Sequence, residues 1–497
     1  MKSNTSFKCV GIIGSGFAGL SAACTLAKEG YAVKVFEKNE LPGGRARKFE
    51  EQGFVFDMGP SWYWMPEVFE QFFNKFGKKA SDYYELVRLD PSYSVILGKD
   101  NEIKIPASYA ELQQIFENIE AGSAQKLDAY LAEAEYKYNV GMAEFVWKAG
   151  DSILEFADMR VLSSIFKLDM LTSIAEQVRS NFTHPALRQI LEFPVLFLGA
   201  KPEKTPALYS LMNYADIKLG TWYPLGGMYK VIEAMVSIAK ELGVEFHLST
   251  EVKSINVPNG KAKSIGTDKG EFLVDFVVAG ADYHHVEQTL LPLRSRVYDE
   301  KYWQGRTMAP SSLLFYLGYS DVKPGLLHHN LFFDKDFAQH AIEIYDKPCW
   351  PTDPLFYLCC PSKTDETIAP KGCENIFLLV PIAPGLENDT TEIREKYFDI
   401  LCQRIMDLKG IDLKENLIFK KSYCINDFKD DYHAFKGNAY GLANTLKQTA
   451  FLKPKIKSKK VSNLFYAGQL TSPGPGVPPS LISGQVAAGL IIKDTTT

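Results

Sequence analysis

A glycine-rich turn near the start of the chain has the residue types and spacing that bind phosphate groups. It consists of Gly14, Ser15, Gly16, Phe17, Ala18 and Gly19. The apolar run at 9–13 predicts a buried strand before it, and the composition of 20–28 predicts a helix after it. Gly14 and Gly16 let the backbone turn and approach a pyrophosphate, and Gly19 lets the helix pack closely on the strand. Because a helix N-terminus favours anions, the turn predicts a dinucleotide site.

An acidic residue closes the second strand of this unit. The run at 31–36 predicts that strand, and Glu37 follows it, 18 residues after Gly19. Glu37 can accept hydrogen bonds from a ribose diol and would repel a 2′-phosphate. Lys38, the next residue, is also a candidate cofactor contact. The strand–turn–helix–strand pattern with its acid is typical of both NAD and FAD sites and does not separate them.

The segment that follows separates the two cofactors. It contains a Gly-Gly-Arg run at 43–45 and, at 53–61, the sequence Gly-Phe-Val-Phe-Asp-Met-Gly-Pro-Ser. These residues resemble the N-terminal signature of the FAD-dependent amine oxidase and carotenoid desaturase superfamily. The resemblance implies that the first run lies under the phosphate and ribityl chain and that the second comes beside the isoalloxazine. The implied contacts are Gly43, Gly44, Arg45 as the phosphate-side cation, Gly59, Pro60 and Ser61. Asp57 is expected to fix the geometry of its loop.

The C-terminal region resembles the same superfamily. The sequence Asn-Leu-Phe-Tyr-Ala-Gly at 463–468 is similar to its second FAD-contact strand, which ends here at Gly468. Gln469 stands where the family often has an acid or a small residue, and its amide could still hydrogen-bond the ribityl chain. The Gly/Pro loop at 471–480, with Val477 and Pro478, leads into a final helix predicted at 481–492, and its backbone N–H groups could face the flavin pyrimidine. Val252, in a strand predicted at 251–257, is a further candidate FAD contact.

Motifs along the whole chain resemble the bacterial and fungal phytoene desaturase group. They lie at 56–66, 222–228, 358–372, 437–441 and 473–478. The resemblance implies a carotenoid desaturase of carotenoid biosynthesis, with phytoene as the first candidate substrate. The flavin would take a hydride at N5 from an allylic carbon, and a neighbouring proton would leave to form a C=C bond. The final electron acceptor would be oxygen or a quinone.

Such a substrate has no polar group, so its affinity would come from apolar burial and no catalytic triad is expected. None is found in the sequence. Two adjacent histidine pairs, 284–285 and 328–329, are poor joint ligands because neighbours on a strand point to opposite faces. No metal is expected. A membrane-dissolved substrate also requires contact with a leaflet, for which 151–200 is the candidate docking surface, with an ordinary core as the competing interpretation.

Composition limits the other possibilities. The 497 residues carry a formal net charge of −5, which argues against a nucleic-acid-binding protein. The eight cysteines show no CxxC spacing, so neither a zinc site nor a disulfide framework is expected. No secretory signal and no apolar stretch of spanning length is present. We therefore expect a cytoplasmic protein, peripherally associated with the inner face of the membrane, whose oligomeric state stays open.

Segments of predicted alternating strands and helices occur in three separated parts of the chain. This pattern predicts an α/β fold built from interleaved parts. A Rossmann-like FAD-binding domain of the glutathione-reductase type is expected to alternate with a mixed α+β substrate domain that includes a helical, membrane-facing part. The expected FAD-binding parts are 1–90, 215–295 and 440–497; the helical region is 91–214, and the mixed-sheet substrate region is 296–439. A buried strand is expected at 272–281.

Several functions remain as alternatives. A later-step desaturase acting on hydroxylated or cyclic carotenoids fits the same motifs. An amine oxidase or protoporphyrinogen oxidase is disfavoured in part because no Ser-Gly-Gly-Cys-Tyr flavin-linking run is present. A non-catalytic isoprenoid-binding relative is disfavoured by the intact cofactor motifs. An NAD dehydrogenase would have no use for the Gly-Gly-Arg loop.

Overall fold

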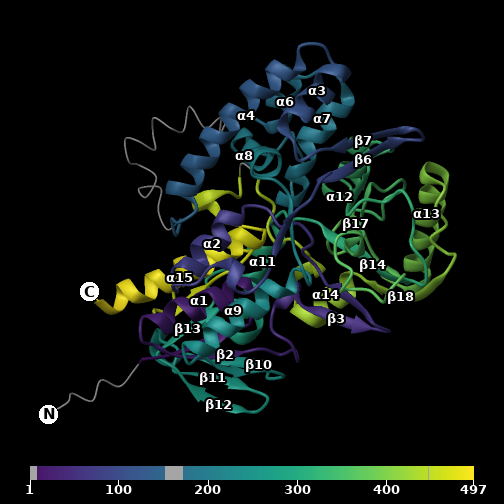
Figure 1. Ribbon diagram of the computed structural model, residues 1–497. Coiled ribbons are helices and arrows are strands. Elements are labelled where there is room, and N and C mark those ends of the chain that lie inside the picture. Colours follow the sequence, from purple (N-terminus) through teal and green to yellow (C-terminus); the bar gives the residue numbers. More distant parts are fainter. Residues whose placement is uncertain (1–7, 151–171, 446, 497) are drawn as a thin grey trace.

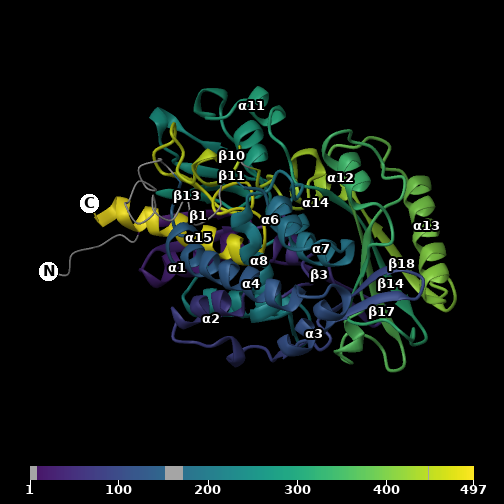
Figure 2. The same ribbon diagram turned by 90° about the horizontal axis from the view of Figure 1, so that it is seen from above.

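The computed structural model describes residues 8–150, 172–445 and 447–496. Three regions are visible in Figure 1: a parallel sheet with its helices, a larger mixed sheet beside it, and a group of helices above both. Figure 2, turned by 90°, shows α13 (Thr391–Lys409) along the outer side of the larger sheet. The expected α/β fold is confirmed.

The parallel sheet has five strands in the order β19-β13-β1-β2-β9. Its strands come from widely separated parts of the chain: β1 (Cys9–Ile13), β2 (Ala32–Phe36), β9 (Glu245–His247), β13 (Phe276–Ala279) and β19 (Leu464–Tyr466). Three helices accompany it: α1 (Phe17–Lys28), α9 (Tyr229–Glu241) and α15 (Val477–Thr496). The final helix is therefore longer than the predicted 481–492. The carboxyl ends of these parallel strands meet at one edge of the sheet, where α/β proteins bind their ligands.

A three-stranded antiparallel sheet packs on this parallel sheet. It contains β10 (Val252–Asn256), β11 (Ser264–Thr267) and β12 (Gly270–Leu273). A Cβ on Gly11 of β1 would lie 2.4 Å from Ile265 Cδ1 on β11, so the two sheets approach closely at this glycine. The single strand predicted at 272–281 is wrong: β12 and β13 belong to different sheets, and the chain turns between them at 274–275.

The larger sheet has seven strands in the order β18-β14-β17-β16-β15-β6-β7, antiparallel except between β15 and β6. The strands are β6 (Tyr93–Gly98), β7 (Asn101–Ile105), β14 (Ser311–Tyr319), β15 (His329–Phe332), β16 (Phe356–Cys359), β17 (Glu374–Ile382) and β18 (Leu417–Tyr423). One face packs with α13 in a separate apolar cluster that includes Phe315, Phe398 and Leu401. The remaining helix beside it is α12 (Phe337–Tyr345).

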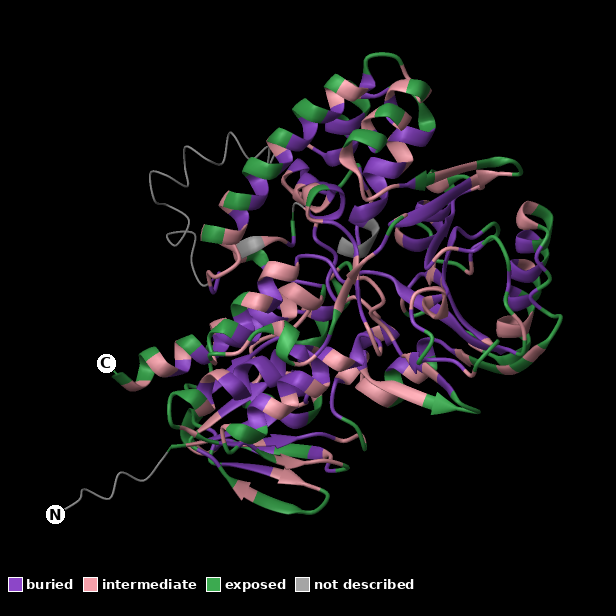
Figure 3. Cartoon of the chain, in the orientation of Figure 1, coloured by how far each residue is buried: buried purple, intermediate pink, exposed green. Residues whose placement is uncertain are grey.

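The helical group contains α3 (Tyr109–Ile119), α4 (Ser123–Val140), α6 (Ile174–Asn181), α7 (Pro185–Glu192) and α8 (Leu211–Tyr214). Figure 3 shows that the exposed residues of these helices face outward and their buried residues face the group's interior. The Ser173 hydroxyl accepts from Glu176 N at 3.2 Å while Glu176 accepts from Ser173 N at 2.8 Å, so α6 begins with a reciprocal capping box.

Shorter elements connect these regions. Two small sheets pair β3 (Lys48–Glu51) with β4 (Phe54–Asp57) and β5 (Leu86–Arg88) with β8 (Trp222–Pro224). The short helices are α2 (Pro66–Asn74), α10 (Tyr283–His285), α11 (Glu300–Gln304) and α14 (Ile425–Tyr432). β4 leads directly into the loop with Gly59 and Ser61.

Candidate active site

The glycine turn between β1 and α1 has the geometry that its sequence predicts. Gly14 has φ +90°, and its N–H donates to Phe36 O at 2.8 Å, which ties the turn to the end of β2. A Cβ on Gly19 would lie 2.0 Å from Gly14 O. Only a residue without a side chain allows this approach, so the start of α1 sits directly above the turn.

Glu37 organises the same turn from the end of β2. One carboxylate oxygen accepts from Ser15 N at 3.0 Å and from Ser15 Oγ at 2.7 Å. The other accepts from Asn39 N and Asn39 Nδ2, both at 3.0 Å. The side chain is 4% exposed. The sequence located Glu37, but not the part that Ser15 and Asn39 play in orienting it.

The Gly-Gly-Arg loop lies against the glycine turn. Gly43 N donates to Ser15 O at 2.9 Å, and a Cβ on Gly44 would lie 3.3 Å from Gly16 Cα. Gly43 and Gly44 both have positive φ, +119° and +56°. The two glycine loops therefore touch backbone to backbone, as a cradle for a phosphate chain requires.

Arg45 carries a buried cation into this cradle. Its Nη2 donates to Asn438 O at 3.2 Å, and its guanidinium lies 5.1 Å from the centre of the Tyr432 ring. Burial lowers the pKa of Arg45, although Asp282 acts against this shift. The Nε atom is buried and has no hydrogen-bond partner among the described residues. An unsatisfied buried guanidinium donor matches a phosphate oxygen, so the site fits the pyrophosphate of a dinucleotide.

The C-terminal strand meets this region at the same edge of the sheet. Gly468, after β19, has φ +112°, and its N–H donates to Ser483 Oγ at 3.0 Å. A Cβ on Gly484 would lie 2.1 Å from Ala18 O, which brings α15 into close contact with α1. One terminal atom of the Gln469 amide lies 3.1 Å from Asn438 Oδ1 and from Arg45 Nη2. Gln469 is thus beside the candidate phosphate cation.

The other predicted contacts take different positions. Lys38 donates to the Asp430 carbonyl. Val252 lies in an apolar cluster with Phe36. Pro60 lies in the loop after β4, and Val477 and Pro478 form the first turn of α15. No geometry in the structure joins Lys38 or Val252 to the pyrophosphate turn, and their cofactor contacts stay predictions.

Asp57 fixes the junction between its loop and α9. Its two carboxylate oxygens accept from Met228 N at 2.7 Å and Tyr229 N at 3.0 Å. A Cβ on Gly227 would lie 2.7 Å from Asp57 Oδ2. Burial raises the pKa of Asp57 to about 7, and the two backbone hydrogen bonds oppose that shift. This is the structural role that the sequence predicted for Asp57.

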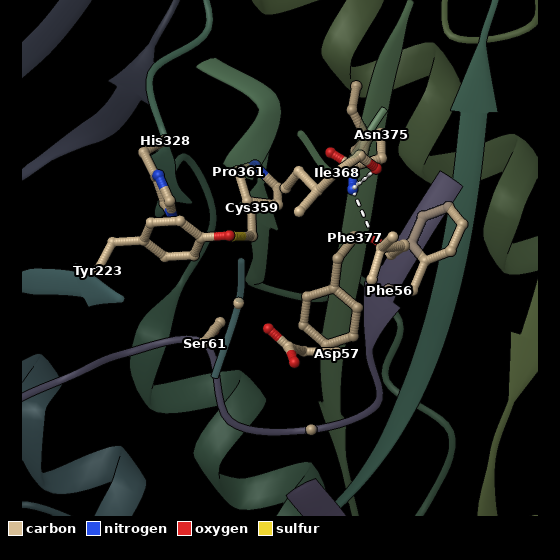
Figure 4. A pocket seen from close by; sticks show the side chains of 14 residues that line it. Phe56, Asp57, Ser61, Tyr223, His328, Cys359, Pro361, Ile368, Asn375 and Phe377 are labelled. Carbon is tan, nitrogen blue, oxygen red and sulfur yellow. Dashed lines mark hydrogen bonds between the residues drawn. The ribbon is translucent and has the colours of Figure 1, made fainter. Parts of the chain in front are cut away.

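A small cavity of about 30 Å³ lies between the loop after β4 and the large sheet. Figure 4 shows the Tyr223 hydroxyl directed toward Cys359, with His328 beside the Tyr223 ring. Its lining combines polar groups with apolar side chains: Val55, Phe56, Asp57, Gly59, Ser61, Tyr223, Gly227, His328, Cys359, Pro361, Ile368, Asn375, Ile376 and Phe377. The cavity joins residues of the predicted flavin-side loop to the sheet that faces it.

His328 lines this cavity, and the ring of His329 lies beside it, with ring centres 4.4 Å apart. The prediction that they point to opposite faces is wrong, because His328 lies in a bend just before β15 and not within the strand. One ligand atom from each, with Cys359 Sγ, lies within 4.8 Å of the others. Burial raises the pKa of Cys359 to about 12, so the thiol keeps its proton in the absence of a metal. The other pair does diverge: His284 contacts Glu300, and His285 stacks on His433.

A chain of hydrogen bonds leads from the loop into the sheet. Ser61 Oγ lies 3.0 Å from the Tyr357 hydroxyl, which lies 2.6 Å from His329 Nδ1. The His329 ring stacks on Trp62 with centres 4.0 Å apart. Burial lowers the pKa of His329 far below its ordinary value, so its imidazole is neutral at physiological pH. Tyr357 was not predicted from sequence, because its partners lie 28 and 296 residues away.

Comparison with known proteins agrees with this geometry. The family model described as flavin containing amine oxidoreductase matches residues 17–492. The chain belongs to this family. Since the βαβ turn fits a dinucleotide and the family contains flavin, the cofactor is FAD, as predicted, and the enzyme is an FAD-dependent oxidoreductase.

Two similar proteins are carotenoid desaturases. A carotenoid 3,4-desaturase of Haloarcula japonica is 42% identical over 99% of this chain and 99% of its own. A zeta-carotene-forming phytoene desaturase of Myxococcus xanthus is 30% identical over 98% and 94%. An oxidoreductase structure from Methanosarcina mazei has a TM-score of 0.64 at 16% identity, covering 98% of this chain and all of that one, which supports the fold. The resemblance to carotenoid desaturases is confirmed.

Proposed function

We propose that the protein is an FAD-dependent carotenoid desaturase. The observation that carries the proposal is the 42% identity, along nearly the whole of both chains, to a carotenoid 3,4-desaturase. The FAD-site geometry is compatible with it: the Gly14–Gly19 turn, Arg45 and Gly468 meet at one edge of the parallel sheet. These features also argue against a non-catalytic isoprenoid-binding relative, for which an intact flavin cradle has no evident use.

FAD held by the Gly14–Gly19 turn and Arg45 would supply the acceptor for a hydride from an allylic carbon of the carotenoid, and loss of a proton from the neighbouring carbon would complete the C=C bond. The chain must bind the polyene, exclude water and accept the proton. Clustered aromatic side chains next to Ser61 are the candidates for the first two tasks. Trp62 contacts the rings of Tyr93 and Phe193 at centre distances of 5.4 and 6.2 Å. Each Å² of polyene surface buried against such groups contributes about 25 cal/mol.

The proton can pass into the Ser61–Tyr357–His329 chain. Each group in it is within hydrogen-bond distance of the next. A neutral imidazole is a sufficient acceptor for a proton released beside an electron-deficient allylic carbon, even when burial has weakened it as a base. Burial lowers the pKa of His328 to about 3, so this imidazole is also neutral. Its Nδ1 lies 2.8 Å from the Thr364 hydroxyl, with which it forms a hydrogen bond. Thr364 is partly exposed. Nε2 of His328 and Nε2 of His329 have no hydrogen-bond partner among the described residues, so the hydrogen-bonded chain ends at His329.

The substrate can be either an early or a late intermediate of carotenoid biosynthesis. Phytoene is the first candidate from the sequence motifs. The higher identity to the 3,4-desaturase than to the phytoene desaturase, 42% against 30%, favours a later carotenoid. The test is to incubate FAD-loaded protein with liposomes containing either phytoene or a hydroxylated carotenoid, and to separate the products. Longer-wavelength products from one substrate only would select between them, and no product from any carotenoid would contradict the proposal.

We also propose that the substrate enters from a membrane leaflet and that the protein docks on the inner face as a peripheral protein. Among the described residues, no helix combines the length and apolar character needed to cross a bilayer. Of the candidate docking surface, 151–171 lie outside the described residues. In the part of this surface that follows residue 171, four apolar residues are buried: Ile174, Val178, Leu187 and Ile190. Turnover that is equal with and without liposomes or detergent would contradict docking. Oxygen and a quinone are the candidate final acceptors.

A further inference from the structure

Lys453 is a buried cation at the loop that follows β19. It is 2% exposed, and its Nζ donates to Pro473 O at 3.0 Å. A Cβ on Gly474 would lie only 2.3 Å from Nζ, so the glycine is what lets the amine reach this loop. An ammonium group has three donors, and one of them is used by Pro473.

No carboxylate compensates this charge. None of the ion pairs among the described residues includes Lys453, and burial alone lowers its pKa, to about 7. Other deeply placed basic groups of the protein do have acidic partners: Lys363 pairs with Glu374, and Arg404 pairs with Asp334. An isolated buried ammonium is costly, and buried charges are therefore normally paired. Among the described residues no anion compensates Lys453, which indicates a partner from outside them, such as a ligand.

A second buried polar atom faces the same glycine. Asn444 is 2% exposed, and its Oδ1 has no hydrogen-bond partner among the described residues. This oxygen lies 3.2 Å from the position of a Cβ on Gly474. Lys453 Nζ, a cationic donor, and Asn444 Oδ1, an unsatisfied acceptor, thus both lie close to Gly474. Each unsatisfied buried acceptor costs stability, so this pair calls for a ligand with both an acceptor and a donor.

The position of the pair relates it to the cofactor. The loop follows the last strand of the parallel sheet, at the edge where the pyrophosphate turn also lies. A Cβ on Gly468, at the start of this loop, would lie 3.8 Å from Ala18 Cβ on α1. The loop then continues into the N-terminus of α15, whose dipole favours negative charge.

We propose that Lys453 and Asn444 recognise the pyrimidine edge of the flavin and that Lys453 stabilises its reduced form. The edge offers an N3–H donor next to the C2 carbonyl, which is the complement of Asn444 Oδ1 and Lys453 Nζ. Reduction places negative charge around N1 and the C2 carbonyl, where a nearby cation is favourable. The inference rests on the proposed placement of the flavin at this loop and does not depend on which carotenoid is the substrate.

The test is an equilibrium measurement of the flavin midpoint potential without substrate, on FAD-loaded wild type, Lys453→Met, Lys453→Arg and Lys457→Met. Lys453→Met should shift the reduced-to-oxidised equilibrium at least tenfold toward the oxidised flavin, a potential about 30 mV lower for two electrons. Lys453→Arg keeps the charge and should stay within about threefold of wild type. Lys457→Met, which removes a partly exposed lysine paired with Asp494, should not change the potential.

Affinity for FAD gives the second readout. Asn444→Leu removes the acceptor at similar volume and should weaken FAD binding about tenfold while leaving the potential nearly unchanged. A Lys453→Met protein that binds FAD with the wild-type potential would overturn the proposal and make Lys453 a purely structural residue. Because no carotenoid is present in these measurements, failure of the proposed desaturase activity would be seen separately.

Discussion

Asp57 Oδ2 accepts a hydrogen bond from Met228 N at 2.7 Å, across 171 residues of sequence. With the second bond from Tyr229 N, this carboxylate caps the N-terminus of α9 and fixes the end of β4 against it. The loop that carries Gly59 and Ser61 begins at this point. A structural bond between two distant segments therefore sets where the predicted flavin-side loop lies.

Replacing Asp57 should destabilise the protein more than replacing an ordinary helix-capping residue does. Asp57→Ala leaves two buried N–H groups without partners and should lower the free energy of unfolding by about 2–3 kcal/mol. Asp299 caps α11 in an exposed position by accepting from Tyr302 N at 2.8 Å. Asp299→Ala should therefore cost only about 0.5–1 kcal/mol. Chemical denaturation of both variants measures the difference, and equal losses would refute the capping role.

Two glycines of α15 provide a matched test of the contact between α1 and α15. A Cβ at Gly484 would meet Ala18 O at 2.1 Å, whereas nothing lies within 4 Å of a Cβ at Gly489. Gly484→Ala must push α15 away from the cofactor turn. It should lower the free energy of unfolding by about 1–3 kcal/mol and reduce the amount of FAD that the protein retains. Gly489→Ala should stabilise the helix by up to about 1 kcal/mol. The flavin content of the purified proteins and their melting temperatures check both outcomes.

Arg45 should contribute to FAD affinity through its charge and its buried Nε. Arg45→Met should raise the dissociation constant of FAD roughly 10–100-fold, since hydrogen bonds to charged groups contribute about 1.5–3 kcal/mol. Arg296→Met is the control, because Arg296 donates to the Leu291 carbonyl away from the cofactor turn. Titration of apoprotein with FAD measures both. An unchanged affinity for Arg45→Met would contradict the phosphate assignment.

The Ser61–Tyr357–His329 chain should matter for turnover and not for cofactor binding. Tyr357→Phe removes the central hydroxyl and should slow flavin reduction by substrate roughly tenfold to a hundredfold, with FAD content unchanged. Tyr63→Phe removes a buried hydroxyl whose hydrogen-bond partner among the described residues is Tyr84, 2.8 Å away, and should leave the reduction rate near wild type. Rapid-mixing absorbance measurements would settle the comparison. A Tyr357→Phe rate equal to wild type would exclude the chain as the proton path.

The stability of the apoprotein should depend on pH through Lys453. Burial lowers its pKa from the ordinary lysine value of 10.5 to about 7 in the folded protein, so the unfolded chain binds more protons between these values. Stability therefore rises with pH across that window, and the burial cost of Lys453 is largest below about pH 7. Wild type should gain stability relative to Lys453→Met as the pH rises from 7 to 9. A difference that is constant with pH would contradict an uncompensated buried amine.

The cofactor turn could be predicted from sequence because its determinants are local. Gly14, Gly19 and Glu37 lie within one βαβ unit, and their spacing is enforced by one helix and two strands. The division of 272–281 into two strands was not predicted, because apolar residues flank Asp275 on both sides and a single polar residue does not separate one interrupted strand from two. Only tertiary pairing sends one half to β11 and the other to β1.

The residues that orient the site were missed for the same physical reason. Asn438 contacts Arg45 across 393 residues and Tyr357 contacts Ser61 across 296 residues, on different elements. The histidine pair at 328–329 shows the limit of periodicity: one residue before a strand, alternation no longer applies. Lys453 was not predicted, because its burial is visible only in three dimensions.

The most direct test of the central claim is a single-turnover reaction without oxygen. FAD-loaded protein is mixed with liposomes that contain phytoene or a hydroxylated carotenoid, and the flavin and polyene absorbances are followed together. A carotenoid desaturase should lose its oxidised-flavin absorbance while a longer-wavelength polyene band appears in equal amount. A flavin that stays oxidised with every carotenoid, in a protein that retains its FAD, would contradict the proposed function.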